Sequence, residues 1–231
     1  MCVLVACSST KKNTGLTRSI HAFKARYNTY YNGSVAFKDG RKAQEDGNKD
    51  NFTEVIPFYL IENKATAKMG AGNFDRAIEK CKKAIKQHSI TTRPKWTKKR
   101  AKTEKDRIWL SQREYNPFLW RAWMLMGEAQ LRQGEYMEAA STFAYIQKLY
   151  FSKPDIVAKA KVLEAQCYAS LDWFYDAEDL LARAKRDSFP TNLIPVKAGV
   201  DAEIQLRQGM YAEAIPNVLT SLNAEKRSLP K

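Results

Sequence analysis

Apolar residues return at helical spacing along much of the second half of the chain. Between residues 136 and 150 they stand three or four positions apart, with polar residues between them, and segments 174–184 and 211–218 repeat the pattern. This period places apolar side chains on one face of a helix. It predicts three amphipathic helices whose apolar positions are Tyr136, Ala139, Ala140, Phe143, Ile146, Tyr150, Phe174, Ala177, Leu181, Ala184, Tyr211, Ala214, Ile215 and Val218.

Each of these helices follows a copy of one short motif. QLRQGEYMEA at 130–139 and QLRQGMYAEA at 205–214 share eight of ten residues, and SLDWFYDAEDLL is a weaker copy between them. Asp172 takes the place of Gly134 and Gly209, so the copies are 38 and 37 residues apart. A period of this length indicates stacked units, each formed by a helix, a tight polar turn and a second helix.

The residue types at fixed positions of the unit match the tetratricopeptide repeat. Trp123, Met126 and Gly127 stand where the first helix of that repeat carries Trp, Leu and Gly. Ala139 and Phe143 follow where its second helix carries Ala and Phe. The small Ala lets two helices approach closely, and an aromatic residue after the turn fills the space between them. We therefore expect an all-α, tetratricopeptide-like α-solenoid of helix-turn-helix repeats with a basic insertion.

The first part of the chain, 14–90, is expected to be helical and to contain one repeat-like unit. GNFDRAIEKCKKAIKQHS at 72–89 carries one apolar stripe opposite a basic face, as a second helix beginning at its aromatic residue would. Residues 17–46 also have helical spacing and predict one or two helices. The segment 52–60, FTEVIPFYL, is predicted to be extended and bound to the helical surface.

A basic insertion, 91–117, separates this region from the repeats at 118–231. It opens with Thr-Thr-Arg-Pro and closes with Asn-Pro, both typical of loops. Eight basic residues stand between positions 93 and 107, against two acidic ones, and two tryptophans accompany them. The candidate partner-binding residues of the insertion are Trp96, Lys98, Lys99, Arg100, Lys102 and Trp109.

Three interpretations of this basic run stay open. It could bind an acidic protein or an anionic surface through its charge. Interleaved bases and aromatic rings can also bind single-stranded nucleic acid, with cations on the phosphates and rings stacked on the bases. The third interpretation is a solvated, partly helical loop whose tryptophans pack on the neighbouring repeat. We do not expect nucleic acid, because no signature of an RNA or DNA recognition module accompanies the run.

Composition limits the chemistry of the chain. With 231 residues, 44% of them hydrophobic, it can form a sizeable core, and its formal charge of +14 favours anionic partners. Cys81 and Cys167 are expected to be buried, and His21 and His88 stand too far apart in sequence to suggest a site. No motif for a catalytic centre, a metal or a cofactor is present. We therefore expect a protein that is not an enzyme and needs no cofactor or metal.

The segment LVAC at 4–7 fits the bacterial lipobox. Signal peptidase needs small side chains before the bond that it cuts, and the thiol of Cys7 would then receive the diacylglycerol. Acyl chains on this residue would hold the protein at a membrane through ~0.8 kcal/mol per buried methylene. The run itself is too short to span a bilayer, which takes roughly 20 apolar residues. We interpret 1–13 as a remnant lipoprotein signal and tether; the alternative is a chance match at a frayed terminus.

Three segments together resemble the N-terminal part of the SprE/PorW lipoproteins of Bacteroidota: 7–33, 75–94 and 115–147. The resemblance covers most of 7–185, and AIEKCKKAIKQHSI and NPFLWRAWMLMG are its specific blocks. It implies a periplasmic lipoprotein of the outer membrane that serves type IX secretion and, in gliding species, motility, by bridging secretion components. Only Cys7 matches a functional position of the family. Its members are much longer than this chain, which stops after a second-helix pattern without an evident capping helix.

These features lead us to expect a non-catalytic protein-binding scaffold, lipid-anchored in the bacterial cell envelope. Its expected partners are envelope proteins of a secretion or motility complex and the membrane itself, through the acyl anchor on Cys7. The alternatives are a soluble adaptor of the same fold, in which the cysteine has no role, and a helical-repeat protein that binds RNA.

Overall fold

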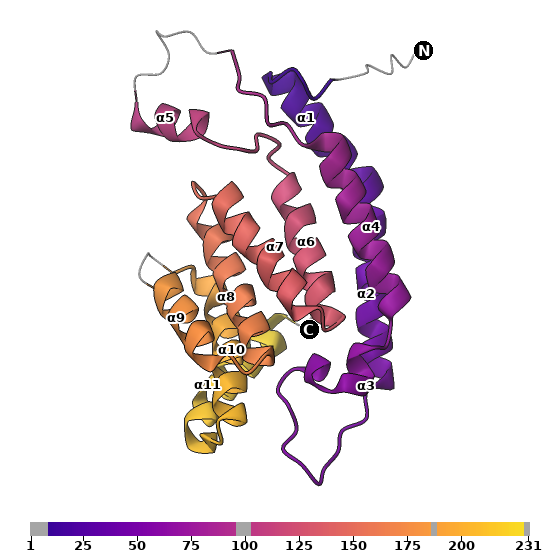
Figure 1. Ribbon diagram of the computed structural model, residues 1–231, viewed down its shortest axis with the longest axis vertical. Coiled ribbons are helices and arrows are strands. Elements are labelled where there is room, and N and C mark those ends of the chain that lie inside the picture. Colours follow the sequence, from indigo (N-terminus) through magenta and orange to yellow (C-terminus); the bar gives the residue numbers. More distant parts are fainter. Residues whose placement is uncertain (1–8, 96–102, 186–188, 229–231) are drawn as a thin grey trace.

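Helices and the turns between them build the computed structural model, which describes residues 9–95, 103–185 and 189–228 (Figure 1). No strand occurs in these ranges, so the described chain is all-helical. None of its helices combines the length and the apolar character needed to cross a membrane.

A long helix opens the fold. It consists of α1 (Gly15–Lys24), a π-helical segment (Ala25–Tyr30) and α2 (Tyr31–Gly47), which follow one another without a break. Every fourth residue along its first half is buried: Thr17, His21, Ala25, Thr29 and Gly33. Positions four apart drift around an α-helix of 3.6 residues per turn, and the wider i→i+5 turns of the π-helix take up this drift. One face of the long helix therefore stays turned toward the protein, and the opposite face stays in solvent.

The buried face of α2 packs against α4 (Ala71–His88), which lies beside it in Figure 1. The two helices approach closely because α2 has glycine at the contact: a Cβ on Gly40 would lie 2.8 Å from the ring of Phe74. Cys81 is fully buried on this face, as the sequence predicts. The predicted helix start is wrong here, since α4 begins before Phe74, directly after the left-handed Gly70 (φ 71°).

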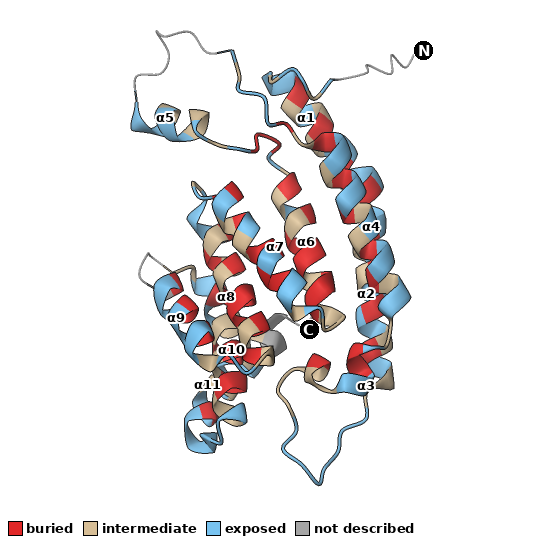
Figure 2. Ribbon diagram, viewed as in Figure 1, coloured by how far each residue is buried: buried red, intermediate tan, exposed pale blue. Residues whose placement is uncertain are grey.

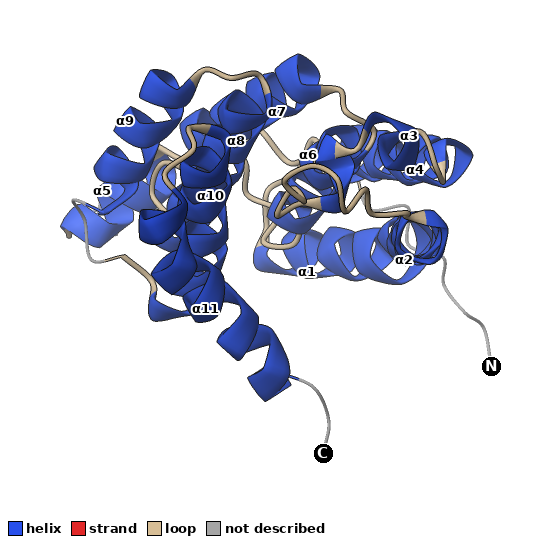
Figure 3. Ribbon diagram, turned by 90° about the horizontal axis from the view of Figure 1, so that it is seen from below, coloured by secondary structure: helices blue, strands red, loops and turns tan. Residues whose placement is uncertain are grey.

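Three helix pairs follow in the second half of the chain, and Figure 3 shows them from the end. They are α6 (Leu119–Arg132) with α7 (Tyr136–Leu149), α8 (Pro154–Ser170) with α9 (Phe174–Lys185), and α10 (Ile194–Arg207) with α11 (Tyr211–Ser228). Neighbouring pairs also touch, because α4 packs on α6, α7 on α8, and α8 on α10.

The turns inside the three pairs have the same geometry. Gly134, Asp172 and Gly209 are left-handed, with φ of 81°, 62° and 76°. In each turn the N–H of the next residue donates to a carbonyl five positions back, over 3.0 Å, 2.9 Å and 2.8 Å in chain order. These are the six-to-one bonds of a Schellman motif, which favours glycine at the left-handed position. The alignment of the three copies is confirmed, including the Asp that replaces Gly in the second.

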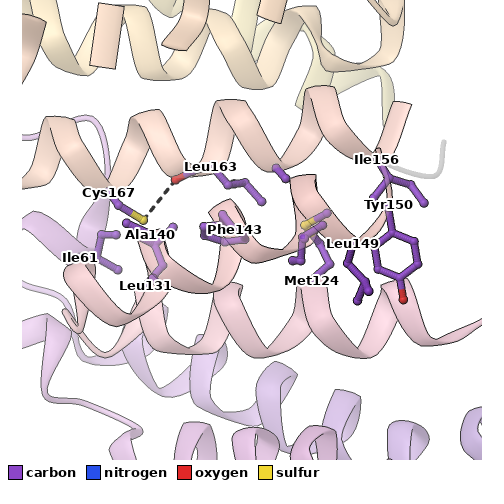
Figure 4. Close-up of a cluster of buried hydrophobic side chains, with 13 residues drawn as sticks. Ile61, Met124, Leu131, Ala140, Phe143, Leu149, Tyr150, Ile156, Leu163 and Cys167 are labelled. Atoms are coloured by element: carbon purple, nitrogen blue, oxygen red, sulfur yellow. Dashed lines mark hydrogen bonds between the residues drawn. The ribbon is translucent and has the colours of Figure 1, made fainter. Parts of the chain in front are cut away.

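Small residues stand where paired helices touch. Ala139 and Ala177 have no exposed surface, as predicted, and burial follows the facing sides of the helices in Figure 2. Gly127 of α6 has the same role as Gly40, because a Cβ there would lie 2.7 Å from the ring of Phe143. Figure 4 shows Phe143 in the centre of the largest core cluster, with Cys167 at one end of it.

Residues 48–63, which we call the strap, connect α2 to α3 (Lys64–Ala67) and cross to the repeats. The first half of the strap is exposed, with 84% of Phe52 in solvent. Its second half docks: the N–H of Phe58 donates to Glu203 of α10 (3.0 Å), and Ile61 joins the core of α6 to α8. The predicted contact of 52–60 with the helical surface is thus correct only from position 57 onward.

Arg207 of α10 fixes the end of the strap. Its guanidinium makes ion pairs of 2.8 Å with Glu62 of the strap and with Asp172 in the turn between α8 and α9. Glu203 lies beneath them with 1% of its surface exposed. Burial, and next the neighbouring Glu62, raise the pKa of Glu203 to about 7.

Candidate functional site

The structure places one of the seven residues that the sequence singles out. Trp109 lies half-buried in α5 (Glu104–Leu110), where its ring meets Tyr115 edge-on at 5.5 Å. The guanidinium of Arg18 on α1 lies 5.2 Å from the centre of the same ring. The contacts of Trp109 thus include α1, which the sequence did not predict. The other six lie outside the described residues: Cys7, Trp96, Lys98, Lys99, Arg100 and Lys102.

The two ends of the insertion are clamped together by a buried carboxylate. Glu114, 5% exposed, accepts hydrogen bonds from the N–H of Ile90 (2.9 Å), the N–H of Asn116 (2.7 Å) and the hydroxyl of Ser89 (2.5 Å). Its pKa is raised by burial, although these donors oppose the rise. A second bond runs from the side chain of Asn116 to the carbonyl of His88 (2.9 Å). These hydrogen bonds therefore hold the first and last residues of the insertion next to each other at the end of α4.

The long helix begins beside this insertion. The side chain of Asn13 donates to the carbonyl of Thr92 (2.6 Å) and accepts from Arg18 (2.6 Å). Together with the stacking of Arg18 on Trp109, these bonds hold both limbs of the insertion near α1. Figure 1 shows α5 and α1 at the same end of the molecule.

A cleft of about 690 Å³ lies at this end, between the long helix and the start of α6. We call it the aromatic–arginine cleft, because five aromatic rings and two arginines line it. Its residues are Ala22, Phe23, Arg26, Tyr27, Tyr30, Pro117, Phe118, Trp120 and Arg121.

The cations of the cleft lie on its rings. Arg121 is 4.4 Å from the ring centre of Trp120, and Arg26 is 5.0 Å from that of Tyr27. Tyr27 in turn packs on Phe23, with ring centres 4.7 Å apart. Phe23, Tyr27 and Arg26 lie in or beside the π-helical segment, on the side away from α4. The wide π turns that keep one face of the helix buried therefore keep these side chains together on the other.

The electrostatics of the cleft are one-sided. No carboxylate lines it, and no salt bridge in the described part of the chain involves Arg26 or Arg121. Burial raises the pKa of the Tyr30 hydroxyl, so this group stays neutral at ordinary pH. An anion would find two guanidinium groups here that can donate charge-assisted hydrogen bonds to it.

The arrangement is suited to binding. Apolar walls with a few convergent polar groups are typical of ligand sites. The residues that line the cleft include no carboxylate, histidine, cysteine or serine that could act as base or nucleophile. Elsewhere in the described ranges no group of three His, Cys, Asp or Glu side chains could hold a metal ion.

The two histidines meet, contrary to our expectation from their spacing. Their Nδ1 atoms lie 3.0 Å apart between α1 and the end of α4, and both side chains are buried. Burial lowers the pKa of His88 to about 4, with smaller effects of the same sign from His21 and Lys24. Helix packing joins these residues across 67 positions, and no local pattern marks them as a pair.

Comparison with protein-family models and with curated protein sequences finds no match for this chain.

Proposed function

We propose that this chain is a non-catalytic protein-binding scaffold built from tetratricopeptide-like helix pairs. The observation that carries the proposal is the shared geometry of the three turns, whose left-handed residues follow one another at 38 and 37 positions. Units of this period form extended helical surfaces in repeat proteins, and such surfaces commonly serve binding. The aromatic–arginine cleft adds a recess suited to a partner's side chains.

We further propose that lipid on Cys7 anchors the scaffold in the bacterial cell envelope, where it serves type IX secretion or gliding motility. This part rests on the lipobox at 4–7 and on the resemblance to the SprE/PorW lipoproteins. A soluble adaptor of the same fold is the alternative, and the fate of Cys7 separates the two.

The anchor can be tested by fractionation of cells that express the protein. If Cys7 carries the lipid, Cys7→Ser should move the protein from the membrane pellet to the soluble fraction, because no described helix can span the membrane. Cys2→Ser is the matched control and should leave the protein in the pellet. A Cys7→Ser protein that still pellets at high salt would show that Cys7 is not the anchor. An unaltered protein found in the soluble fraction would support the soluble adaptor.

The basic insertion is proposed to attract an acidic envelope partner. Charge reversal of four residues should then slow association, and a nearly unchanged melting temperature would show that the effect is not one of folding. The substitutions to Glu are at Lys98, Lys99, Arg100 and Lys102. A control with the same change of charge replaces exposed lysines of α2 and α4, namely Lys38, Lys42, Lys82 and Lys83. Equal association of both variants with the partner would favour the solvated-loop interpretation.

A further inference from the structure

We propose that the aromatic–arginine cleft docks an acidic polypeptide segment that carries an aromatic side chain. The inference rests on the scaffold role proposed above and names the chemistry of one partner.

The walls of the cleft favour a ligand with an apolar or aromatic side chain. Phe23 and Tyr27 expose 63% and 57% of their surface and line the same cleft as the rings of Phe118 and Trp120. Exposed aromatic surface of this kind is costly in water and is recovered when a partner covers it. A volume of about 690 Å³ takes a few side chains, and a guest ring could pack edge-on as Tyr30 and Phe118 already do at 5.0 Å.

The arginines of the cleft favour a ligand with a carboxylate. The Cζ atoms of Arg26 and Arg121 lie over aromatic rings, and a ring accepts no conventional hydrogen bond from a guanidinium, so its N–H groups stay able to donate to a ligand. A planar carboxylate can accept two of these hydrogen bonds at once. Because neither arginine is ion-paired within the described chain, a carboxylate would not have to displace an internal partner.

The surroundings strengthen the same preference. Arg18, Lys24 and Arg93 lie at this end of the molecule, on α1 and at the start of the insertion. The whole chain carries a formal charge of +14, which steers acidic partners toward it and repels basic ones.

A peptide fits this site better than the other anions a basic protein meets. Single-stranded nucleic acid needs a series of cations that follows its phosphates, and only two arginines line the cleft. A flat lipid surface could cover the exposed Phe23 and Tyr27, but it could not enter the cleft between the long helix and α6 that Phe118 and Trp120 also line.

The test measures binding of a labelled peptide of alternating Glu and Trp by fluorescence anisotropy at physiological salt. Two comparison peptides replace every Trp by Ala, or every Glu by Gln. The protein variants are Tyr27→Ala and the double change Arg26→Gln with Arg121→Gln. Matched controls are Tyr31→Ala, one turn further on and 59% exposed, and the double change Arg76→Gln with Lys83→Gln on α4, which removes the same amount of charge.

We expect both comparison peptides to bind at least about tenfold more weakly than the first, because each lacks one of the two required groups. Tyr27→Ala and the double arginine variant should each lose affinity by about tenfold or more, and the two controls should match the unaltered protein. Circular dichroism checks that each variant is folded. If Tyr27→Ala is not, Phe23→Ala takes its place, since that side chain is equally exposed.

Three results would overturn the proposal. The first is equal binding of the Trp and Ala peptides, which would reduce the effect to general charge attraction. The second is an equal loss of affinity in the double control on α4. The third is tighter, Tyr27-dependent binding of an oligouridine RNA or of anionic vesicles. Cross-linking in cells tests the scaffold role separately. That role stands if the double arginine variant is still cross-linked to the partners of the unaltered protein, and it falls if neither protein is cross-linked to any partner.

Discussion

Acid should destabilise the fold through its buried histidine pair. The Nδ1 atoms of His21 and His88 lie 3.0 Å apart, so one ring donates a hydrogen bond that the other, in its neutral form, accepts. The pKa of His88 falls from 6.5 to about 4 in the folded state. Between these values the unfolded chain binds a proton at His88 and the folded chain does not.

The sign and the size of the effect follow from proton linkage. Because the pKa of this base is lower in the folded state, its contribution to stability is complete above pH 6.5 and is lost as the pH falls toward 4. A difference of one bound proton changes the free energy of unfolding by ~1.4 kcal/mol per pH unit. The loss between pH 6.5 and pH 5 is therefore about 2 kcal/mol.

Urea unfolding followed by circular dichroism, at about pH 7.5 and about pH 5, measures this loss. The unaltered protein should lose about 2 kcal/mol more than His88→Gln between the two conditions. Buried carboxyls with raised pKa, such as Glu203, titrate in the opposite direction, but they do so in both proteins and cancel in the comparison. His21→Gln should reduce the effect without abolishing it, since burial is its main cause. Equal losses in the unaltered protein and His88→Gln would refute the reasoning.

Two further predictions concern the helix contacts. Ala139→Trp should overpack a site with no exposed surface and lower the free energy of unfolding by ~1 to 3 kcal/mol or more. The melting temperature should fall, and an unchanged melting temperature would mean that the repeat register is wrong. Gly127→Ala should also destabilise in urea unfolding, by ~1 kcal/mol or more, because its Cβ would lie 2.7 Å from the buried Phe143 ring. The control Gly72→Ala, with nothing within 4 Å of its Cβ, should instead stabilise by ~0.5 to 1 kcal/mol, and two changes of the same sign would contradict this account.

The sequence predicts the helix pairs well because their determinants are local. In each copy a Gly or Asp stands four positions after the residue whose carbonyl accepts the turn's hydrogen bond, and this short spacing is visible in the sequence. The accepting residues are Gln130, Tyr168 and Gln205. Apolar spacing likewise predicts α4, α7 and α9 within a few residues of their ends. The predicted start of α4 is wrong because the left-handed conformation is taken by Gly70 and not by Gly72, the glycine just before the aromatic Phe74.

The cleft and the histidine pair depend on tertiary packing and could not be predicted in this way. The cleft joins residues 22–30 to residues 117–121, and neither segment contains a motif on its own. Its outer face also needs the π-helical turns, which form where Ala25, Thr29 and Gly33 follow at intervals of four. The nearest signal was the mixture of aromatic and basic residues in 23–31, for which the sequence predicts only a helix.

The strap also determines the order in which the chain can fold during synthesis. Two of its bonds to α10 join residues that are 145 positions apart in the sequence: Phe58 to Glu203 and Glu62 to Arg207. At a ribosomal speed of ~5 to 20 residues per second, the second half of the strap is made roughly 7 to 30 seconds before these partners exist. The helices α2 and α4 can pair during that interval, because their contacts are close in sequence. The bonds of the strap to α10 therefore form late, whereas Ile61 and Tyr59 can pack as soon as α6 to α8 have been made. Until then these two side chains present apolar surface that a chaperone or another nascent chain can reach.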